Sequence, residues 1–298
     1  MKKVLFASTA LVLTAGVAAA EVTISGSANM GLKYNGTDTT VHNEIDFDVK
    51  GSGETDGGLT FGASIDLDAS SDNSANTVGG GASDPEVFIS YEGLTVTVGD
   101  IGEAQAVGGI ADLGYDGIGI DDLVDDIVDS FGSDDVRVDY AFGDIEVAVS
   151  ADSSTAANTK GVALGVSGSV DAFTFAAGYS DRKGALDIDG DNTVDFTGDY
   201  NEATATVGYS AGAFGVTATY SQIDFDGVKV NGYGLHASYT SGDLTVSVAG
   251  SRIDADFADA IDGYGVGFAY DLGGATLAGA VGDIDDTTVA DLGISFKF

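Results

Sequence analysis

The stretch EVTISGSANMGLKY, residues 21–34, alternates between two kinds of side chain. Val22, Ile24 and Leu32 occupy even positions, whereas Thr23 and Lys33 are among the polar or charged residues at odd positions. A period of two places successive side chains on opposite faces of an extended chain. The stretch therefore predicts a β-strand with one apolar face and one polar face.

The same alternation continues to the end of the chain. Short turns separate some strands, and generally longer acidic or polar loops separate the others, which is typical of an antiparallel up-and-down barrel. Tilted strands of about ten residues can cross a membrane. The predicted fold class is all-β, a transmembrane 16-stranded antiparallel up-and-down β-barrel. Its strands are expected near residues 21–34, 42–51, 57–68, 85–92, 93–100, 135–143, 144–151, 160–169, 171–180, 199–210, 212–224, 227–240, 242–252, 261–271, 273–283 and 287–298.

Aromatic residues favour a membrane barrel over a soluble sandwich, which would also alternate. They gather near predicted strand ends on the apolar face, as the aromatic girdles of membrane barrels do. Ordinary core filling is the alternative interpretation. The aromatic residues concerned are Tyr34, Tyr91, Tyr140, Phe142, Phe173, Phe175, Tyr179, Tyr209, Phe214, Tyr220, Tyr239, Phe268 and Tyr270.

Residues 1–20 are predicted to be a cleaved secretory signal peptide. Lys2 and Lys3 make a positive start, residues 4–17 are mostly apolar, and Ala18, Ala19 and Ala20 form a small-residue cleavage site. Residues 21–298 would then form the barrel domain. The chain has no cysteine, so we expect no disulfides. A formal net charge of −37 argues against nucleic-acid binding.

Residues 101–135 form a long acidic segment without Lys or Arg. Loops of this length are usually functional or disordered. Leu123, Val124 and Ile127 recur at helical spacing, which favours a loop with a short helix that folds back and presents carboxylates. The candidate acidic residues are Glu103, Asp112, Asp116, Asp121, Asp122, Asp125 and Asp126.

Several features together resemble a known family. They are the predicted signal peptide, the opening strand from Glu21 to Gly26, the sixteen-strand rhythm, the insertion after Asp100 and the terminal Phe298. The whole of residues 21–298 resembles the trimeric general porins of Gram-negative bacteria, especially the alphaproteobacterial type of purple bacteria. The resemblance implies an outer-membrane location, a homotrimer, and contact with lipid and lipopolysaccharide. Small residues on the first strand, Gly26 and Ala28, are a hint of close contact between neighbouring barrels.

The resemblance also implies that residues 101–135 are the third long loop, which folds into the barrel and faces basic side chains on the wall. Lys33, Lys50 and Arg137 alternate with apolar neighbours, so we expect them to point inward and to form most of this basic wall. Lys229 has the same parity relative to its neighbours and is also expected to face inward.

The predicted function is a general diffusion channel for small hydrophilic solutes and ions, without a required cofactor and without enzyme activity. Rings of carboxylates favour cations, so we expect weak cation selectivity. The alternatives are a solute-specific porin and a calcium-binding adhesive or structural barrel. A secreted β-rich calcium protein is a further alternative.

A candidate calcium loop lies at residues 187–195. The segment resembles the first nine positions of a calcium-binding loop, with acidic residues at positions 1, 3, 5 and 9, which are Asp187, Asp189, Asp191 and Asp195. However, Asn192 replaces the turn glycine, and Gly198 replaces the final bidentate acid. The segment is therefore either a calcium site or an acidic surface loop. The resemblance also allows calcium to bind among lumenal acids.

Overall fold

The computed structural model describes residues 21–72, 84–125, 127, 134–152, 160–186 and 196–298. The predicted signal peptide, the candidate calcium loop and Asp126 lie outside these residues. Within the described residues, no helix is long and apolar enough to cross a membrane.

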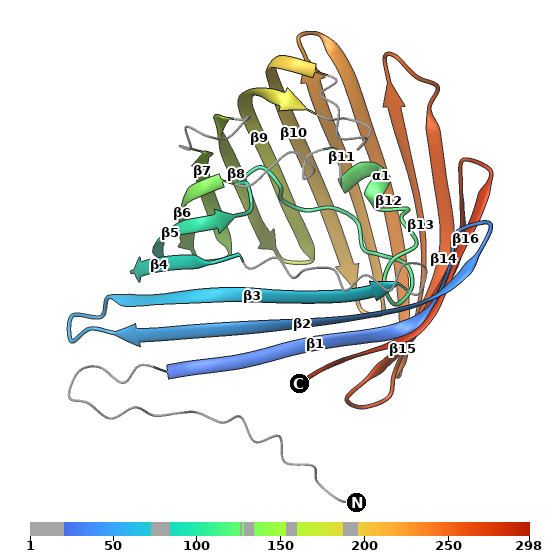
Figure 1. Ribbon diagram of the computed structural model, residues 1–298, viewed down its shortest axis with the longest axis horizontal. Helices are drawn as coiled ribbons and strands as arrows, with labels where there is room; N and C mark the ends of the chain where they lie inside the picture. Colours follow the sequence, from blue (N-terminus) through green and yellow to red (C-terminus); the bar gives the residue numbers. More distant parts are fainter. Residues whose placement is uncertain (1–20, 73–83, 126, 128–133, 153–159, 187–195) are drawn as a thin grey trace, which may run out of the picture.

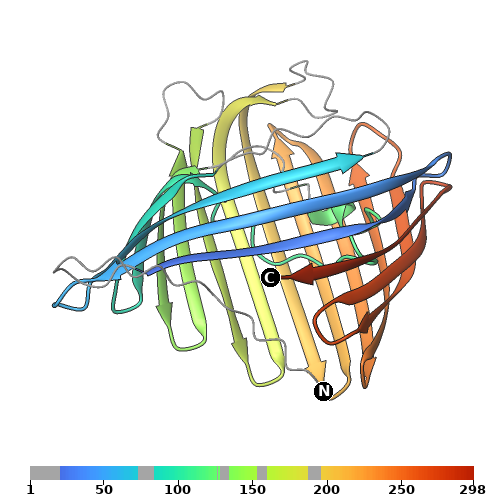
Figure 2. The ribbon, with the colours of Figure 1, turned by 60° about the horizontal axis from the view of Figure 1, so that its bottom comes forward.

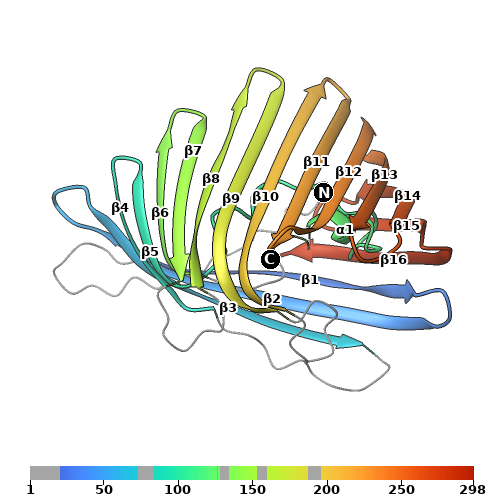
Figure 3. The same ribbon diagram turned by 90° about the horizontal axis from the view of Figure 1, so that it is seen from above.

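The described chain forms a closed barrel of sixteen strands in which every sequential pair is antiparallel, as predicted. Figure 3 shows β1–β3 along one side of the barrel and β6–β12 along the opposite side. The strands are β1 (Glu21–Tyr34), β2 (Thr39–Glu54), β3 (Thr60–Asp72), β4 (Glu86–Tyr91), β5 (Leu94–Ile101), β6 (Asp134–Phe142), β7 (Ile145–Asp152), β8 (Lys160–Val170), β9 (Phe173–Leu186), β10 (Phe196–Ala211), β11 (Phe214–Phe225), β12 (Val228–Ser241), β13 (Leu244–Ala255), β14 (Ile261–Asp271), β15 (Thr276–Ile284) and β16 (Thr287–Lys297).

Some strands extend further than the sequence pattern predicts. β9 continues to Leu186 instead of ending near residue 180, and β2 begins at Thr39 instead of near residue 42. Beyond the apolar belt a hairpin can continue to pair in water, where backbone hydrogen bonds need no apolar side chains. The loss of apolar alternation therefore marks the edge of the belt better than the end of a strand.

The barrel closes where β1 pairs with β16. The register runs from Ser27 opposite Lys297 to Tyr34 opposite Ala290, and Gly26 and Phe298 exchange two backbone hydrogen bonds of 2.9 Å. A Cβ on Gly26 would lie 2.8 Å from the Phe298 ring, which also meets the Phe47 ring edge-on. The absence of a side chain at Gly26 therefore leaves room for the ring of Phe298.

The outer face carries the apolar set. Ile24 is 67% exposed and Met30 is 57% exposed. Such apolar exposure is unfavourable in water but favourable against lipid. Most of the aromatic residues predicted for the girdles lie on this face. Those among the exposed large hydrophobic residues are Tyr91, Tyr140, Phe142, Phe173, Tyr179, Tyr209, Phe214, Tyr239, Phe268 and Tyr270.

The chain leaves β5 for the long loop through an irregularity in the β5–β6 pairing, between Val98 and Ile101. Gly99 has φ of +153°, and a Cβ there would lie 2.1 Å from the Pro85 carbonyl oxygen. Only glycine fits this turn. The loop contains α1 (Asp122–Asp125), which Figures 1 and 2 show on the inner side of the barrel, beside β11–β13.

Candidate functional site: the pore constriction

The loop between β5 and β6 packs inside the barrel through apolar side chains. Leu113, Ile120 and Val124 are 1%, 1% and 0% exposed. The facing wall makes room for them with glycine: a Cβ on Gly265 would lie 2.6 Å from Ile120 Cδ1, and one on Gly234 would lie 2.8 Å from Val124 Cγ1. These contacts place the loop against the inner face of β12–β14.

Wall glycines and wall hydroxyls act together to bind the loop. We call the first group the glycine wall, which consists of Gly232, Gly234, Gly263, Gly265 and Gly282 on β12–β15. The hydroxyls satisfy loop backbone groups that would otherwise be unpaired inside the barrel. Ser150 accepts from the Ala104 N–H at 2.7 Å, Thr206 accepts from the Gly109 N–H at 3.0 Å, and Ser221 and Ser251 donate to the carbonyls of Val124 and Ile120.

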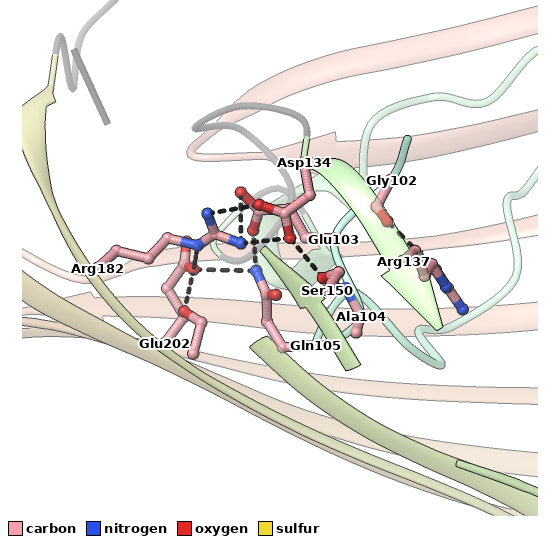
Figure 4. A network of polar contacts seen from close by, with 10 residues as sticks. Gly102, Glu103, Ala104, Gln105, Asp134, Arg137, Ser150, Arg182 and Glu202 are labelled. Atoms are coloured by element: carbon pink, nitrogen blue, oxygen red, sulfur yellow. Dashed lines mark hydrogen bonds and ion pairs between the residues drawn. The ribbon is translucent and has the colours of Figure 1, made fainter. Parts of the chain in front are cut away.

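Arg182 on β9 joins the start and end of the loop to the wall (Figure 4). Its guanidinium contacts both carboxylate oxygens of Asp134 at 3.1 Å, Glu103 at 3.0 Å and Glu202 at 3.5 Å. All four side chains are at most 3% exposed. Gln105 donates to Glu202 at 2.9 Å. One guanidinium therefore faces three carboxyl groups in a dry pocket, which we call the arginine cluster.

The arginine cluster holds three carboxyl groups and one guanidinium, and Glu103 is the carboxyl group that binds a proton. Burial, reinforced by the charge of Glu202, raises the pKa of Glu103 to about 8, although Arg182 opposes the shift. Glu103 is thus mainly protonated at neutral pH and buried. Glu103 lies at the start of the loop, buried against Arg182 and away from the lumenal surface.

Asp116 lies at the tip of the loop and contacts the wall directly. One carboxylate oxygen lies 2.8 Å from Lys33 Nζ and 3.1 Å from His42 Nε2, and the other accepts a hydrogen bond from Asn29 at 2.9 Å. Lys33 and Asp116, both singled out in the sequence, are therefore brought together. His42 and Asn29 were missed, because neither residue type stands out on a polar strand face.

Three other acidic candidates group together near the tip. Asp112 and Asp122 are exposed, and Asp121 is partly exposed. Burial and a side-chain hydrogen bond with Asp112 raise the pKa of Asp121 to about 8. Burial and the charge of Asp112 also raise the pKa of Asp122, but its side chain is exposed, as is that of Asp112, so these two are the loop carboxylates best placed to carry negative charge into the lumen.

Asp125 has a structural contact. Its carboxylate accepts the Ile110 N–H at 3.2 Å, and its oxygens occupy the space that a Cβ on Gly109 would need. It therefore ties α1 to an earlier part of the loop.

The two other predicted basic residues face inward but do not approach the loop tip. Arg137 lies 2.8 Å from Asp139 and donates to the Gly102 carbonyl, where the loop begins. Lys50 Nζ lies 5.0 Å from the centre of the Phe88 ring. The basic groups are thus distributed around the barrel, and the described residues show no compact basic cluster opposite the loop.

The prediction that Lys229 faces the lumen is wrong. Its neighbour Val230 is 7% exposed and packs inside the barrel with Ile127 of the loop. Lys229 therefore points outward, where its Nζ lies 3.6 Å from Asp224. The parity argument failed because the inserted loop makes this part of the inner face apolar.

A different part of the inner face is strongly acidic. Asp46 on β2 lies opposite Asp68 on β3, and Asp48 lies opposite Asp66. Like charges in direct cross-strand pairs are unfavourable unless water or cations screen them. These four residues, which we call the acidic wall, share their strand face with Lys50.

Within the described residues, two groups bring three potential metal-ligand atoms within 4.8 Å of one another. One is His42, Glu44 and Asp116, where the Lys33 ammonium already contacts Asp116. The other is Asp46, Asp66 and Asp68 of the acidic wall. The latter set offers only carboxylate oxygens, the ligands that calcium prefers.

One short motif resembles a hydrolase element. Residues 208–212 read Gly-Tyr-Ser-Ala-Gly, which matches the Gly-x-Ser-x-Gly pattern of a nucleophile elbow. The elbow requires a sharp turn from a strand into a helix. Here the segment is the end of β10 and the hairpin turn to β11, so the motif has no catalytic geometry.

Comparisons with known proteins agree with this architecture. A family model described as Gram-negative porin matches residues 7–289. A porin from Rhodobacter capsulatus is 29% identical over 309 residues, covering 93% of this chain and 100% of that protein. A porin from Fuscovulum blasticum is 28% identical over 312 residues with the same coverage.

Solved structures show the same fold. A porin structure refined at 1.8 Å superimposes with a TM-score of 0.71 at 24% identity, covering 93% of this chain and 100% of that one. An engineered variant of the Rhodobacter blastica porin superimposes with a TM-score of 0.69 at 23% identity and the same coverage.

Proposed function

Since the chain belongs to the Gram-negative porin family, we propose that it is a general diffusion channel for small hydrophilic solutes, narrowed by the β5–β6 loop and selective for cations. Family membership makes the protein an outer-membrane diffusion channel and not an enzyme. The finer proposal concerns where the channel narrows and which ions it favours.

The observation that carries the proposal is the charge around two cavities on either side of the loop tip. A cavity of about 300 Å³ is lined by Asp112, Asp116 and Asp122, with Lys33 as its one basic lining residue among those described. Asp116 lies against Lys33, so the remaining charge is negative.

The second cavity, of about 770 Å³, has a similar balance. It is bordered by Tyr115 of the loop tip and lined by the carboxyl groups of Glu44, Asp243 and Asp271, with Lys297 as a basic group. Solutes approaching the tip from either end therefore meet an excess of carboxylates. Negative rings in a narrow aqueous path concentrate cations and favour their passage.

A basic wall facing an acidic loop would create an electric field across the pore. In this proposal that field is weak, because basic residues of the wall are already paired. Lys33 is paired with Asp116, and Arg137 is paired with Asp139. The acidic wall on β2 and β3 adds further negative charge on the inner face. Net negative charge, and not separation of opposite charges, is then the main electrostatic property of the channel.

The homotrimer remains part of the proposal and rests on the resemblance to general porins. Ala28 supports it as a small residue on the outer face of β1, whereas Gly26 is explained by Phe298. Outer-membrane lipid and lipopolysaccharide would contact the remaining apolar belt. We propose no required cofactor; Ca²⁺ would bind most readily to Asp46, Asp66 and Asp68.

Recording from planar bilayers tests these points together. Under a KCl gradient, the reversal potential should have the sign of potassium permeation, and conductance should rise without saturation as salt increases. Steps arriving in threes would support the trimer, and a conductance decrease on adding CaCl₂ would support calcium binding in the lumen. A reversal potential that favours chloride would refute cation selectivity, and saturation by one solute class would favour a solute-specific porin.

A further inference from the structure

The tip of the loop is seated on the seam where the barrel closes. Gly31 on β1 and Gly293 on β16 are direct cross-strand partners. A Cβ on either residue would lie 2.6 Å from the Tyr115 ring, which is 9% exposed. A side chain at either position would clash with the ring and with a carbonyl oxygen of the seam, that of Leu292 at 2.5 Å for Gly31 and that of Met30 at 2.7 Å for Gly293, so the paired glycines form a flat surface for Tyr115.

The next inward pair along the seam holds the backbone of the tip. Asp291 on β16 lies opposite Lys33 on β1 and is 7% exposed. One of its carboxylate oxygens accepts the N–H groups of Tyr115 at 2.9 Å and Asp116 at 3.1 Å. The other oxygen accepts the Ala280 N–H at 2.9 Å. The carboxylate thus joins two successive loop amides to the wall.

A third glycine allows this approach. Gly114 has φ of +107°, and a Cβ there would lie 2.1 Å from an oxygen of Asp291. The contacts of the Asp116 side chain with Lys33 and His42 complete the attachment on the other side of the seam. The tip is therefore bound to β16, β1 and β2 together.

We propose that Asp291 is the positioning residue of the constriction, holding the loop tip on the β1–β16 seam. The inference rests on the proposed function, in which the loop narrows the channel. Because the seam forms only when the first and last strands pair, the tip can reach its place only in a fully closed barrel. The constriction can therefore form only after β1 and β16 have paired.

The chemistry explains why a carboxylate is needed. Asp291 accepts three N–H groups and donates none. An asparagine of the same shape would turn its NH₂ group toward at least one of those donors, leaving a buried N–H unpaired. Asp291→Asn should therefore loosen the tip without creating a cavity.

The test compares D291N with E146Q in planar bilayers. Glu146 lies on the inward face of β7, with Ala148 and Ser150, and its substitution removes the same charge from the barrel interior. We expect D291N to increase open-channel current noise several-fold and to close at lower voltage, whereas E146Q keeps both at wild-type values. Equal noise in the two variants would overturn the proposal.

A second variant keeps the test decisive if D291N fails to fold, which its migration in unheated detergent gels would reveal. Gly293→Ala places a methyl group against the Tyr115 ring and the Met30 carbonyl oxygen without changing charge, and it should also raise the current noise. Gly51→Ala is the matched control, because a Cβ there meets nothing within 4 Å. Wild-type current noise in G293A would refute the role of Gly31 and Gly293 in positioning Tyr115. A wild-type protein without channels would instead refute the proposed function.

Discussion

The glycine wall on β12–β15 and the acidic wall on β2–β3 are inner faces of the same barrel, yet they follow opposite rules. The glycine wall lies under the loop, where Gly234 and Gly265 admit Val124 and Ile120 to close contact. The acidic wall carries Asp46 opposite Asp68 and Asp48 opposite Asp66. One surface is built to be covered by protein, and the other is built to meet water and ions.

The two walls show that an inward position in a barrel has no single chemical character. Where the loop covers the wall, side chains must be small or must satisfy loop backbone groups, as Ser221 and Ser251 do. On the acidic wall the carboxylates are half-buried or exposed and lie in like-charge pairs, which water or cations in the lumen must screen. Burying the same charges under the loop would require a partner such as Arg182.

The largest expected effect comes from removing that partner. Arg182→Met would leave Glu103, Asp134 and Glu202 in a dry pocket without a cation, so we expect the free energy of unfolding to fall by about 3–5 kcal/mol. Denaturant unfolding in detergent, followed by tyrosine fluorescence, measures it.

Arg252→Met is the matched control. Arg252 pairs with Asp262 at 3.0 Å, but both side chains are about half exposed, so the loss should be about 0–1 kcal/mol. Equal losses in the two variants would show that the arginine cluster is no more important than a surface ion pair.

An intermediate effect should appear as a pH dependence of the covered region. The pKa of Glu103 is about 8 in the folded protein against an ordinary value of 4.5, so the folded state holds an extra proton between these values. Stability must then fall as pH rises from 4.5 to 8 and level off above 8.

Glu103→Gln removes this dependence. The melting temperature of E103Q relative to wild type should therefore rise across the same window, from little difference near pH 5 to a clear advantage near pH 9. A difference between the two proteins that does not change with pH would contradict protonation of Glu103.

The smallest effect is expected on the acidic wall, because charges that border an aqueous lumen are screened by salt. The double variant D46N/D66N should shift the reversal potential by a few millivolts toward zero in a low-salt KCl gradient. D285N/D286N is the control, since these exposed turn residues have φ of +49° and +62°, which asparagine tolerates. Equal shifts in both variants would mean that the acidic wall does not contribute specifically to selectivity.

Much of the fold could be predicted because its signal is local. Alternation along residues 21–34 depends only on neighbouring side chains and on the contrast between lipid and water, and β1 has the predicted bounds. The length of residues 101–135, without Lys or Arg, likewise marked the loop. Lys33 and Asp116 could both be selected, although nothing local paired them.

The role of each part of the inner face follows from long-range contacts that the sequence pattern does not contain. Asp291 binds Tyr115 across a separation of 176 residues, and no sequence pattern connects them. Lys229 points outward because Val230 meets the loop inside the barrel, a contact that reverses the local parity signal. Alternation tells which residues share a face of a strand, but what covers that face depends on segments brought together only when the barrel closes.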